Sequence, residues 1–405
     1  MKRIIPYILL AGLLTNGCEI LQKDILPEEG FTKIYNHPEE TLSFYPESVI
    51  ELGGDGYIFV SAVKDEESEV EYPYAYLTRV NASGELEWSL EYSWLSPCSN
   101  LIKQGNSTGF IAMNQQFQAY FVEIDPASGE ELSSTSLGMT MPLYAFSDKS
   151  GNIVVLGYDF VSRSSWVAKY NSNLTLERST LLSINDDLEY EVQRHLNKTG
   201  QSYPFFIGEF DGTAGPGYYV NCFYNYTLRC VFLDASSMGT TGNLYSFRTE
   251  EGISSMLYKS GSLFGMTSYY EGNNYILPET EVKVNSSDNI KDWPANPLYE
   301  LTFKAKVLAG EIATDSADYE LFVSQTNSNS LVMYKYAMES DSLLATIYKE
   351  FDERLEVKDF IQTADKGIVV LARIYILGKY QRPMLIKFPP ETFLPEKEKG
   401  LFTKN

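Results

Sequence analysis

The chain has 405 residues, of which 44% are hydrophobic and 21% are charged, and its formal net charge is −22. The apolar content is normal for a globular protein and excludes a wholly disordered chain. The excess of acids argues against a nucleic-acid partner, because a surface that follows a phosphate backbone needs clustered Lys and Arg. The sequence holds two histidines, too few for a histidine-based metal site, and we expect neither a metal nor a cofactor.

The N-terminus has the pattern of an export signal. Two basic residues precede an apolar run from Ile4 to Leu14, which is shorter than the ~20 residues that span a bilayer. The run from Leu14 to Cys18 resembles a lipobox, in which the cysteine is lipidated and becomes the first residue after cleavage. We therefore expect 1–17 to be a lipoprotein signal peptide and 18–30 a tether anchored through Cys18. A plain secretory signal with an incidental cysteine is the alternative.

From residue 31 onward, short β-type runs alternate with turn residues. The first unit has four such runs, with a glycine-rich turn at 53–56 and a second turn at 82–84. The predicted strands, unit by unit, are 48–52, 57–63, 75–81 and 86–92; 100–103, 109–113, 119–125 and 131–132; 143–146, 153–158, 165–170 and 174–177; 203–207, 217–220, 228–234 and 243–247; 253–258, 263–270, 276–284 and 298–303; 306–308, 319–323, 331–336 and 343–348; and 357–361, 368–373 and 384–388.

A period of roughly 40–50 residues with four strands per unit is typical of propeller blades. The last unit lacks a fourth strand, whereas 31–35 resembles an outer strand and has no unit of its own. Pairing these two ends would close a ring and remove the open sheet edges. We predict an all-β, seven-bladed β-propeller of four-stranded antiparallel blades over 31–390, closed by the N-terminal strand, with a C-terminal tail at 391–405. A pair of β-sandwiches would also give many short strands.

One repeat carries a family resemblance. Residues 54–60 read Gly-Asp-Gly-Tyr-Ile-Phe-Val, and 76–88 read Tyr-Leu-Thr-Arg-Val-Asn-Ala-Ser-Gly-Glu-Leu-Glu-Trp. This pattern resembles the propeller repeats of envelope lipoproteins of Gram-negative anaerobes, in which a glycine-rich turn precedes the second strand and Gly-x-x-x-Trp ends the blade. The resemblance implies an outer-membrane lipoprotein, on the periplasmic or the cell-surface side, which contacts the membrane through Cys18 and binds a glycan or an envelope protein.

The sequence contains no recognisable catalytic motif. Neither histidine lies near a nucleophile motif, and no glycine-rich phosphate loop precedes a predicted helix. We therefore favour a non-catalytic binding or assembly module over an enzyme. The alternative is a propeller glycoside hydrolase with paired carboxylates near the axis, and spacing alone does not identify such a pair among 54 acids.

Aromatic residues gather in the loops that a propeller places on one face. Rings with an apolar body and a polar tip suit sugar stacking or protein contact, whereas the same rings could instead cap the core of each blade. The candidate ligand-binding residues are Tyr72, Tyr74, Trp94, Tyr158, Arg163, Tyr269, Tyr270 and Tyr380.

Two cysteines flank a predicted hairpin. Cys222 and Cys230 are equidistant from Tyr226, so a hairpin centred there would bring them face to face. In an oxidising compartment they form either a disulfide or two small buried hydrophobic residues.

Overall fold

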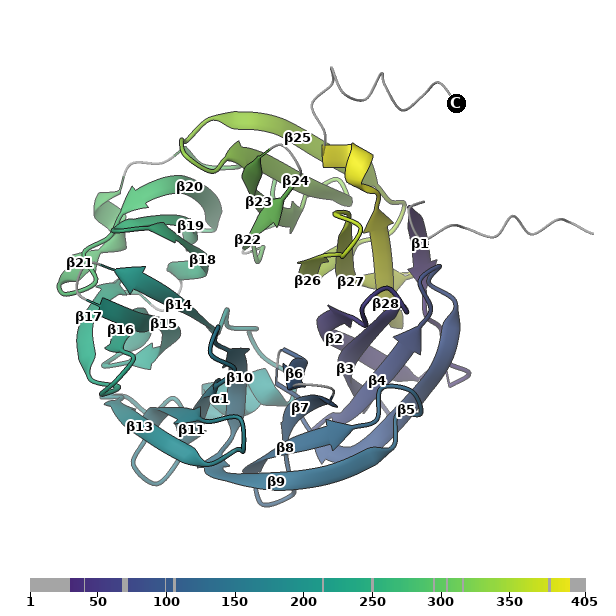
Figure 1. Ribbon diagram of the computed structural model, residues 1–405, viewed down its shortest axis with the longest axis horizontal. Helices are drawn as coiled ribbons and strands as arrows, with labels where there is room; N and C mark the ends of the chain where they lie inside the picture. Colours follow the sequence, from purple (N-terminus) through teal and green to yellow (C-terminus); the bar gives the residue numbers. More distant parts are fainter. Residues whose placement is uncertain are drawn as a thin grey trace, which may run out of the picture.

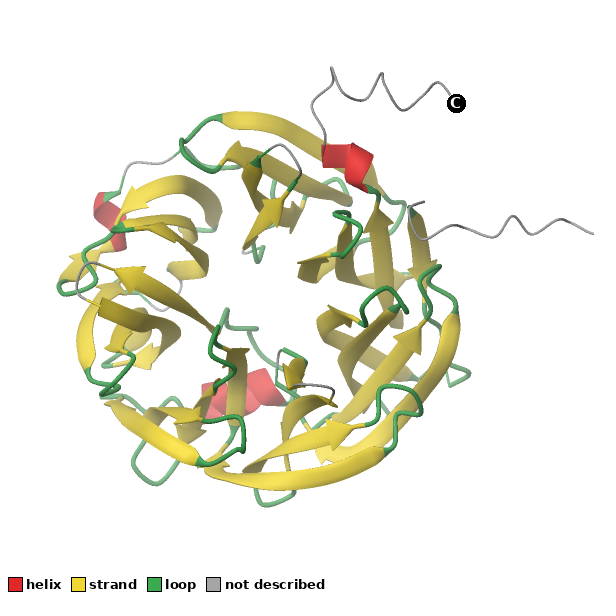
Figure 2. Cartoon of the chain, viewed as in Figure 1, coloured by secondary structure: helices red, strands yellow, loops and turns green. Residues whose placement is uncertain are grey.

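The computed structural model describes residues 30–39, 41–67, 72–98, 100–104, 107–212, 215–248, 251–293, 296–303, 305–314, 317–377 and 380–393. Antiparallel sheets stand radially around a central opening (Figure 1), which is the architecture of a β-propeller. Strands dominate the chain and helices are few and short (Figure 2). The predicted signal peptide, Cys18 and most of the tether and tail lie outside the described residues. Within the described ranges, no helix is long and apolar enough to cross a membrane.

The strands follow one another in meanders, each running from the axis outward. The first sheets hold β2 (Leu42–Glu51), β3 (Tyr57–Asp65), β4 (Tyr74–Val80) and β5 (Leu86–Leu95), then β6 (Ile102–Gln104), β7 (Ser107–Met113), β8 (Gln118–Ile124) and β9 (Glu131–Thr140). A single pairing of Leu95 with Met113 joins these two groups. Next come β10 (Pro142–Ser147), β11 (Ile153–Asp159), β12 (Ser164–Tyr170) and β13 (Leu176–Ser183), then β14 (Phe206–Gly212), β15 (Gly215–Tyr224), β16 (Thr227–Asp234) and β17 (Thr240–Tyr245).

The last sheets hold β18 (Gly252–Ser260), β19 (Leu263–Tyr270) and β20 (Asn273–Glu281), then β22 (Leu308–Ala313), β23 (Asp318–Gln325), β24 (Ser330–Ala337) and β25 (Leu343–Glu350), and finally β26 (Leu355–Gln362), β27 (Ile368–Ile376) and β28 (Tyr380–Phe388). The N-terminal strand β1 (Phe31–Ile34) pairs antiparallel with β28, from Phe31 opposite Lys387 to Ile34 opposite Met384. Residues at the two ends of the described chain therefore share one sheet (Figure 1).

Burial explains the sequence pattern of each strand. The second strands β3, β11 and β27 are nearly continuous apolar runs, because neighbouring sheets cover both of their faces. The second strand β23 is buried over the same length, although it carries polar residues such as Glu320. The outer strands β9, β13 and β25 expose most of their side chains to solvent. Hydrophobic clusters accordingly lie between consecutive sheets, as where Phe31, Val49, Phe59 and Leu385 meet.

Side chains also tie each sheet to the next by bonding to its backbone. Around the ring these contacts are Ser48 Oγ accepting from Leu101 N (3.2 Å), Asn100 Nδ2 donating to Ala145 O (2.7 Å), Ser165 Oγ to Phe223 O (2.8 Å), Asn221 Nδ2 to Ile253 O (3.0 Å), Thr267 Oγ1 to Val307 O (3.0 Å), Gln325 Oε1 accepting from Val357 N (2.9 Å) and Asp359 Oδ2 accepting from Val49 N (2.9 Å). The last of these links the final sheet to the first.

Two predicted strands differ from the structure, and one helix was not predicted. The strand expected at 298–303 is absent, and Pro297, which has no backbone N–H for a ladder, lies just before it. Instead β21 (Ser287–Asn289) pairs parallel with β17, which leaves the β18–β20 sheet with three strands. The strand expected at 306–308 begins only at Leu308, so Lys306 lies in the connection before β22. The polar insertion between β13 and β14 forms a helix, α1 (Glu189–Leu196), whose residues Val192 and Leu196 are buried.

The two cysteines of the hairpin do not face each other. Cys222 stands opposite Arg229 and Cys230 opposite Asn221, because the turn is centred between Asn225 and Tyr226. This half-residue difference shifts the register by one position and puts the two side chains on opposite faces of the sheet. Cys222 and Cys230 are free and buried in separate clusters. The disulfide is thus excluded, and the buried-hydrophobe alternative holds.

Candidate functional site

Register shifts in the inner strands place polar side chains near the axis. The pairing register of β2 skips Glu47, that of β18 skips Ser254, and that of β26 skips Lys358. An extra residue of this kind bends a strand and re-aims its side chain. All three residues line cavities on the axial side of the sheets.

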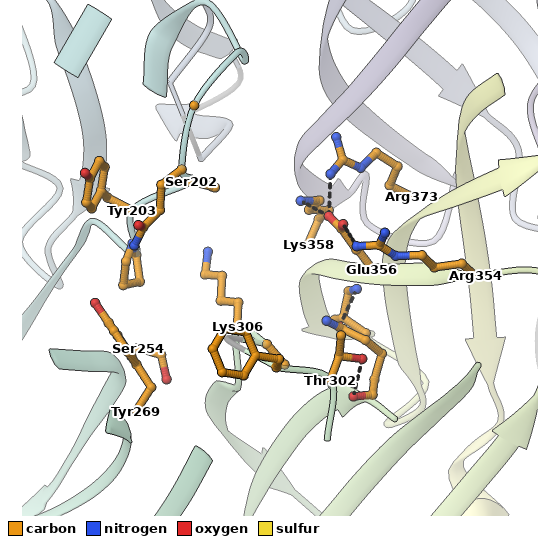
Figure 3. Close-up of a pocket in the computed structure, with 17 residues that line it drawn as sticks. Ser202, Tyr203, Ser254, Tyr269, Thr302, Lys306, Arg354, Glu356, Lys358 and Arg373 are labelled. Atoms are coloured by element: carbon orange, nitrogen blue, oxygen red, sulfur yellow. Dashed lines mark hydrogen bonds and ion pairs between the residues drawn. The ribbon is translucent and has the colours of Figure 1, made fainter. Parts of the chain in front are cut away.

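Two adjoining cavities, of about 300 and 470 Å³, occupy this region. Ser254, Lys306 and Lys358 line both and therefore stand where the cavities meet. The smaller one, which we call the axial cavity, is shown in Figure 3. Its walls come from the segment 200–204 after α1, the connection before β22, and strands β26 and β27. Its volume is at the lower end of the range for small-ligand sites.

A carboxylate with four donors forms one wall of the axial cavity. Glu356 Oε2 accepts from Lys358 Nζ at 2.9 Å and from Arg373 Nη2, and its Oε1 accepts from Arg354 Nη2 at 3.1 Å and from the Tyr375 hydroxyl at 2.8 Å. Burial alone would favour the neutral acid, but the charges of Lys358 and Arg373 hold the pKa of Glu356 well below its usual range. Glu356 is therefore an ionised anchor that orients the cations around it.

Positive charge nevertheless exceeds negative charge in the axial cavity. Among the described residues that line it, tyrosines aside, the ionisable ones are Lys306, Arg354, Lys358 and Arg373 against the single carboxylate of Glu356. The formal excess is three positive charges, in a chain whose net charge is −22. A positively charged cavity in a negatively charged molecule attracts anions, although the rest of the molecule repels them.

Lys306 is the cation without a partner. Its side chain points into the cavity, between Tyr203 on one side and the Glu356 group on the other (Figure 3). No hydrogen bond or ion pair involves its ammonium within the described part of the chain. Burial lowers the pKa of Lys306, and it lowers that of Lys358 to about 8, assisted by the charge of Arg373. An anion would restore both pKa values, since it stabilises the charged forms.

The opposite wall is aromatic and hydroxylic. The Tyr269 hydroxyl is buried and has no hydrogen-bond partner among the described residues, and its side chain lines the cavity together with Tyr203. His195 Nδ1 accepts from Tyr203 N at 3.1 Å, and burial drives the pKa of His195 well below its usual value. This neutral imidazole fixes the segment that carries Tyr203 and is placed as a structural group.

The carboxylates near the axis have structural contacts. Burial raises the pKa of Asp359 to about 6, yet its oxygens accept from the backbone N–H groups of Val49 and Phe360. Glu47 makes an ion pair of 2.6 Å with Lys198, and both oxygens of Glu356 are fully engaged. These contacts do not give the open carboxylate pair, one acid and one base or nucleophile across a bond, that a glycosidase uses.

Three of the predicted ligand-binding aromatics are buried. Tyr72 and Tyr158 are at most 5% exposed and pack in a hydrophobic cluster, so for them the core-capping interpretation fits and the binding-platform one does not. Tyr269 is as buried, but its side chain lines the axial cavity. The reason is geometric, since the connections after the second strands fold back over the ends of the intersheet clusters, where Tyr72 and Tyr158 pack.

The other predicted residues are scattered. Tyr74 packs half-buried on two clusters, and Trp94 donates to Glu131 at 2.9 Å while its ring stacks at 4.8 Å on Tyr120. Arg163 is exposed and forms an ion pair with Asp187 at 3.6 Å. The side chain of Tyr380 lies outside the described residues. Tyr270 lines a separate pocket beside Tyr269.

Sequence reasoning missed the charged wall. Arg354, Glu356 and Lys358 alternate with Leu355 and Val357, which is the period-two pattern of a strand with one charged face. An inner strand turns that face toward the axis, so this alternation was the available signal. The sequence did not indicate a role for Lys306, because the connection that carries it has no hydrophobic periodicity or motif.

No family model and no curated protein sequence matches the chain. Among solved structures, it is similar to the Dos1 propeller (12% identity, 87% of this chain and 86% of that one, TM-score 0.47) and to the WD40 β-propeller domain of Doa1 (7% identity, 88% and 95%, TM-score 0.46). It is also similar to the β-propeller domain of the Trilobed protease from Pyrococcus furiosus (10% identity, 86% and 95%, TM-score 0.44).

Proposed function

We propose that this chain is a lipid-anchored envelope protein whose β-propeller acts as a non-catalytic binding or assembly module. Its site is the axial cavity, where it holds an anionic group of a glycan or protein ligand. The observation that carries this proposal is the excess of positive charge around an unpartnered Lys306.

The charges of Asp359 and Glu47 act on Lys306, but neither carboxylate makes a hydrogen bond or ion pair with its ammonium in the described residues. A buried ammonium without such a direct partner is unfavourable. A carboxylate or phosphate placed between Lys306 and Arg354 would accept charge-assisted hydrogen bonds, which are stronger than neutral ones. It would also offset the repulsion among the cations of the cluster. The Glu356 group is held by its own internal bonds, so the cavity is arranged for an anion before one arrives.

The scaffold we infer is a ring of seven blades closed by β1. The pairing of β1 with β28 and the bond from Val49 N to Asp359 support closure, and the side-chain ties between consecutive sheets support a rigid ring. A rigid ring with varied loops suits recognition. The fold is shared by many functions, so the binding role rests on the cavity and not on the fold.

The anchoring part of the proposal rests on the lipobox at Cys18. It places the protein at the outer membrane, on the periplasmic or the cell-surface side. A Cys18→Ala variant should leave the membrane pellet and appear in the soluble fraction of fractionated cells. If the variant sediments with membranes as the wild type does, the anchor is wrong.

The binding part is tested by titration calorimetry on the full chain. The probes are trigalacturonate, a short oligoglutamate peptide and neutral maltotriose. We expect an acidic probe to bind and Lys306→Met to weaken it by about tenfold or more, as for a lost charge-assisted hydrogen bond. The control is Lys283→Met, which removes an exposed lysine elsewhere.

Three outcomes would contradict the anion site: neither acidic probe binds, an excess of maltotriose displaces the bound acidic probe, or Lys306→Met binds the acidic probes unchanged. Cleavage of trigalacturonate by the wild type would instead support the glycoside hydrolase alternative. For that case, Asp359→Asn is the variant to test, because Asp359 has the raised pKa of an acid catalyst.

A further inference from the structure

A third cavity lies away from the axis, on the sheet that has three strands. Its volume is about 380 Å³, and its lining includes Ser268, Tyr270, Tyr275, Leu277, Lys291 and Trp293. It shares only Tyr269 with the axial cavity. Nothing in the proposed function uses this pocket, which we call the aromatic pocket.

The irregular path of the chain creates the aromatic pocket. After β20 the chain leaves its sheet, β21 pairs with β17, and the short helix η1 (Ile290–Asp292) follows. This detour brings Lys291 and Trp293 beside the face of β19 and β20. Ser268 stands opposite Tyr275 in the strand register, so these two side chains and Tyr270, two residues further along β19, share that face.

The chemistry of the pocket combines aromatic faces with polar edges. Tyr270, Tyr275 and Trp293 are half-buried, so each keeps part of its ring open. The Lys291 ammonium stands 5.0 Å from the centroid of the Tyr270 ring. Within the described ranges, the Tyr270 hydroxyl, the Trp293 indole N–H and the Lys291 ammonium make no hydrogen bond or ion pair.

A pyranose ring needs this combination. Its C–H faces stack on aromatic rings, and its hydroxyls need donors and acceptors at the edges of the site. The charge pattern also differs from that of the axial cavity. Lys291 is the one charged residue among the described residues that line the pocket, and its ammonium already lies over Tyr270.

From these observations we propose that the aromatic pocket binds a neutral pyranose unit of a saccharide, stacked on Trp293 and Tyr270. This goes beyond the proposed function, because the pocket and its ligand chemistry are separate from the anion site. A saccharide chain with acidic units elsewhere could engage both cavities at once.

The test is calorimetry of the full chain with four neutral trisaccharides: maltotriose, cellotriose, mannotriose and chitotriose. We expect at least one to bind, and Trp293→Ala and Tyr270→Ala each to weaken it by about tenfold, as for the loss of a stacking ring. Tyr190→Ala is the matched control, because Tyr190 is 65% exposed on α1. If Trp293→Ala does not fold, Trp293→Leu keeps apolar packing without the ring and takes its place.

The proposal is overturned if none of the four trisaccharides binds, or if binding survives in the Tyr270→Ala/Trp293→Leu double variant. It is also overturned if Lys306→Met abolishes binding of the same trisaccharide, since the sugar would then occupy the axial cavity. Failure of the anion site leaves these outcomes unchanged, so the two proposals are tested separately.

Discussion

Two glutamates, Glu356 half-buried at the axial cavity and Glu320 fully buried between sheets, are stabilised in different ways. Glu356 in β26 has three cations and a tyrosine hydroxyl on its two oxygens, and its pKa is held well below the usual range. Glu320 in β23 is fully buried, and neither of its oxygens has a hydrogen bond within the described part of the chain. Its nearest cation, Lys259 Nζ, lies 3.6 Å away.

The consequence for Glu320 is a shift toward the neutral form. Burial raises its pKa to about 8, and Lys259 only partly opposes that shift. The carboxylate packs directly on Gly265, where a Cβ would stand 1.4 Å from Glu320 Oε1. Glu320 is thus a buried side chain that retains its proton at neutral pH. Glu356 is ionised, and the cations around it leave an excess of positive charge that faces the axial cavity. In this molecule, an acidic side chain marks a candidate binding site only where the positive charges beside it outnumber its own negative charge.

The largest effect is expected at Glu356. Glu356→Ala removes the counter-charge of Lys358 and Arg373 and should lower the free energy of unfolding by about 3–5 kcal/mol, as for a buried pair that loses one partner. Urea unfolding at neutral pH measures this loss. Glu356→Gln, which keeps the packing and one acceptor, should lose less stability and bind acidic probes more tightly. A loss below about 1 kcal/mol in Glu356→Ala would contradict the anchor role.

The next effect is the pH dependence that Glu320 imposes. Its folded pKa of about 8 lies above the ordinary value of 4.5, so between these values the folded state retains a proton that the unfolded state has released. Stability should therefore fall as the pH rises through this window, by at most about 1.4 kcal/mol per pH unit.

Glu320→Gln should flatten this dependence, and comparison of urea midpoints at several pH values in this window would show it. Glu356 predicts the opposite sign at lower pH, because its depressed pKa makes stability fall as the pH drops below 4.5. An unchanged slope in Glu320→Gln would mean that Glu320 is ionised in the folded state.

A third, smaller effect concerns the space around Glu320. Gly265→Ala should cost about 1–3 kcal/mol, as for overpacking, and Glu320→Ala should relieve most of that cost in the double variant. Gly239→Ala, at an exposed turn where the nearest atom is the Ser237 side chain at 3.2 Å, serves as the control. Additive losses in thermal melts would show that the two residues do not interact.

The smallest effect on stability is expected at Lys306. Because its ammonium has no hydrogen-bond or ion-pair partner in the described ranges and burial disfavours its charge, Lys306→Met should not lower the free energy of unfolding by more than about 0.5 kcal/mol. Circular dichroism melts check this alongside the binding titrations. A large loss of stability would identify Lys306 as a structural charge and weaken the case for the anion site.

The periodic part of this molecule could be predicted from the sequence. Buried second strands such as β3, β11 and β27 read as apolar runs, and the pairing of β1 with β28 followed from a missing outer strand. The path after β20 could not be predicted, because β21 pairs with the neighbouring sheet and not with its own. The cysteine pairing failed because symmetry about Tyr226 does not fix a turn centre, and one position of register reverses the faces.

The candidate site was harder to predict than the fold. Aromatic loop residues looked like a binding face, yet Tyr72 and Tyr158 belong to the core because their rings fill the ends of an intersheet cluster. Tyr269 lines the axial cavity instead. The charged alternation in β26 was visible in the sequence. However, its meaning depended on the register shift at Lys358 and on the approach of Lys306 from another sheet, and both are properties of the packed chain.

The most direct test of the central claim is to locate an anion in the crystal. Crystals of the full chain soaked in selenate should give an anomalous peak inside the axial cavity, within hydrogen-bonding distance of Lys306 Nζ, and the peak should be absent in Lys306→Met. Selenate found only on the outer surface, or an axial peak that persists unchanged in Lys306→Met, would contradict the assignment of the cavity as an anion site.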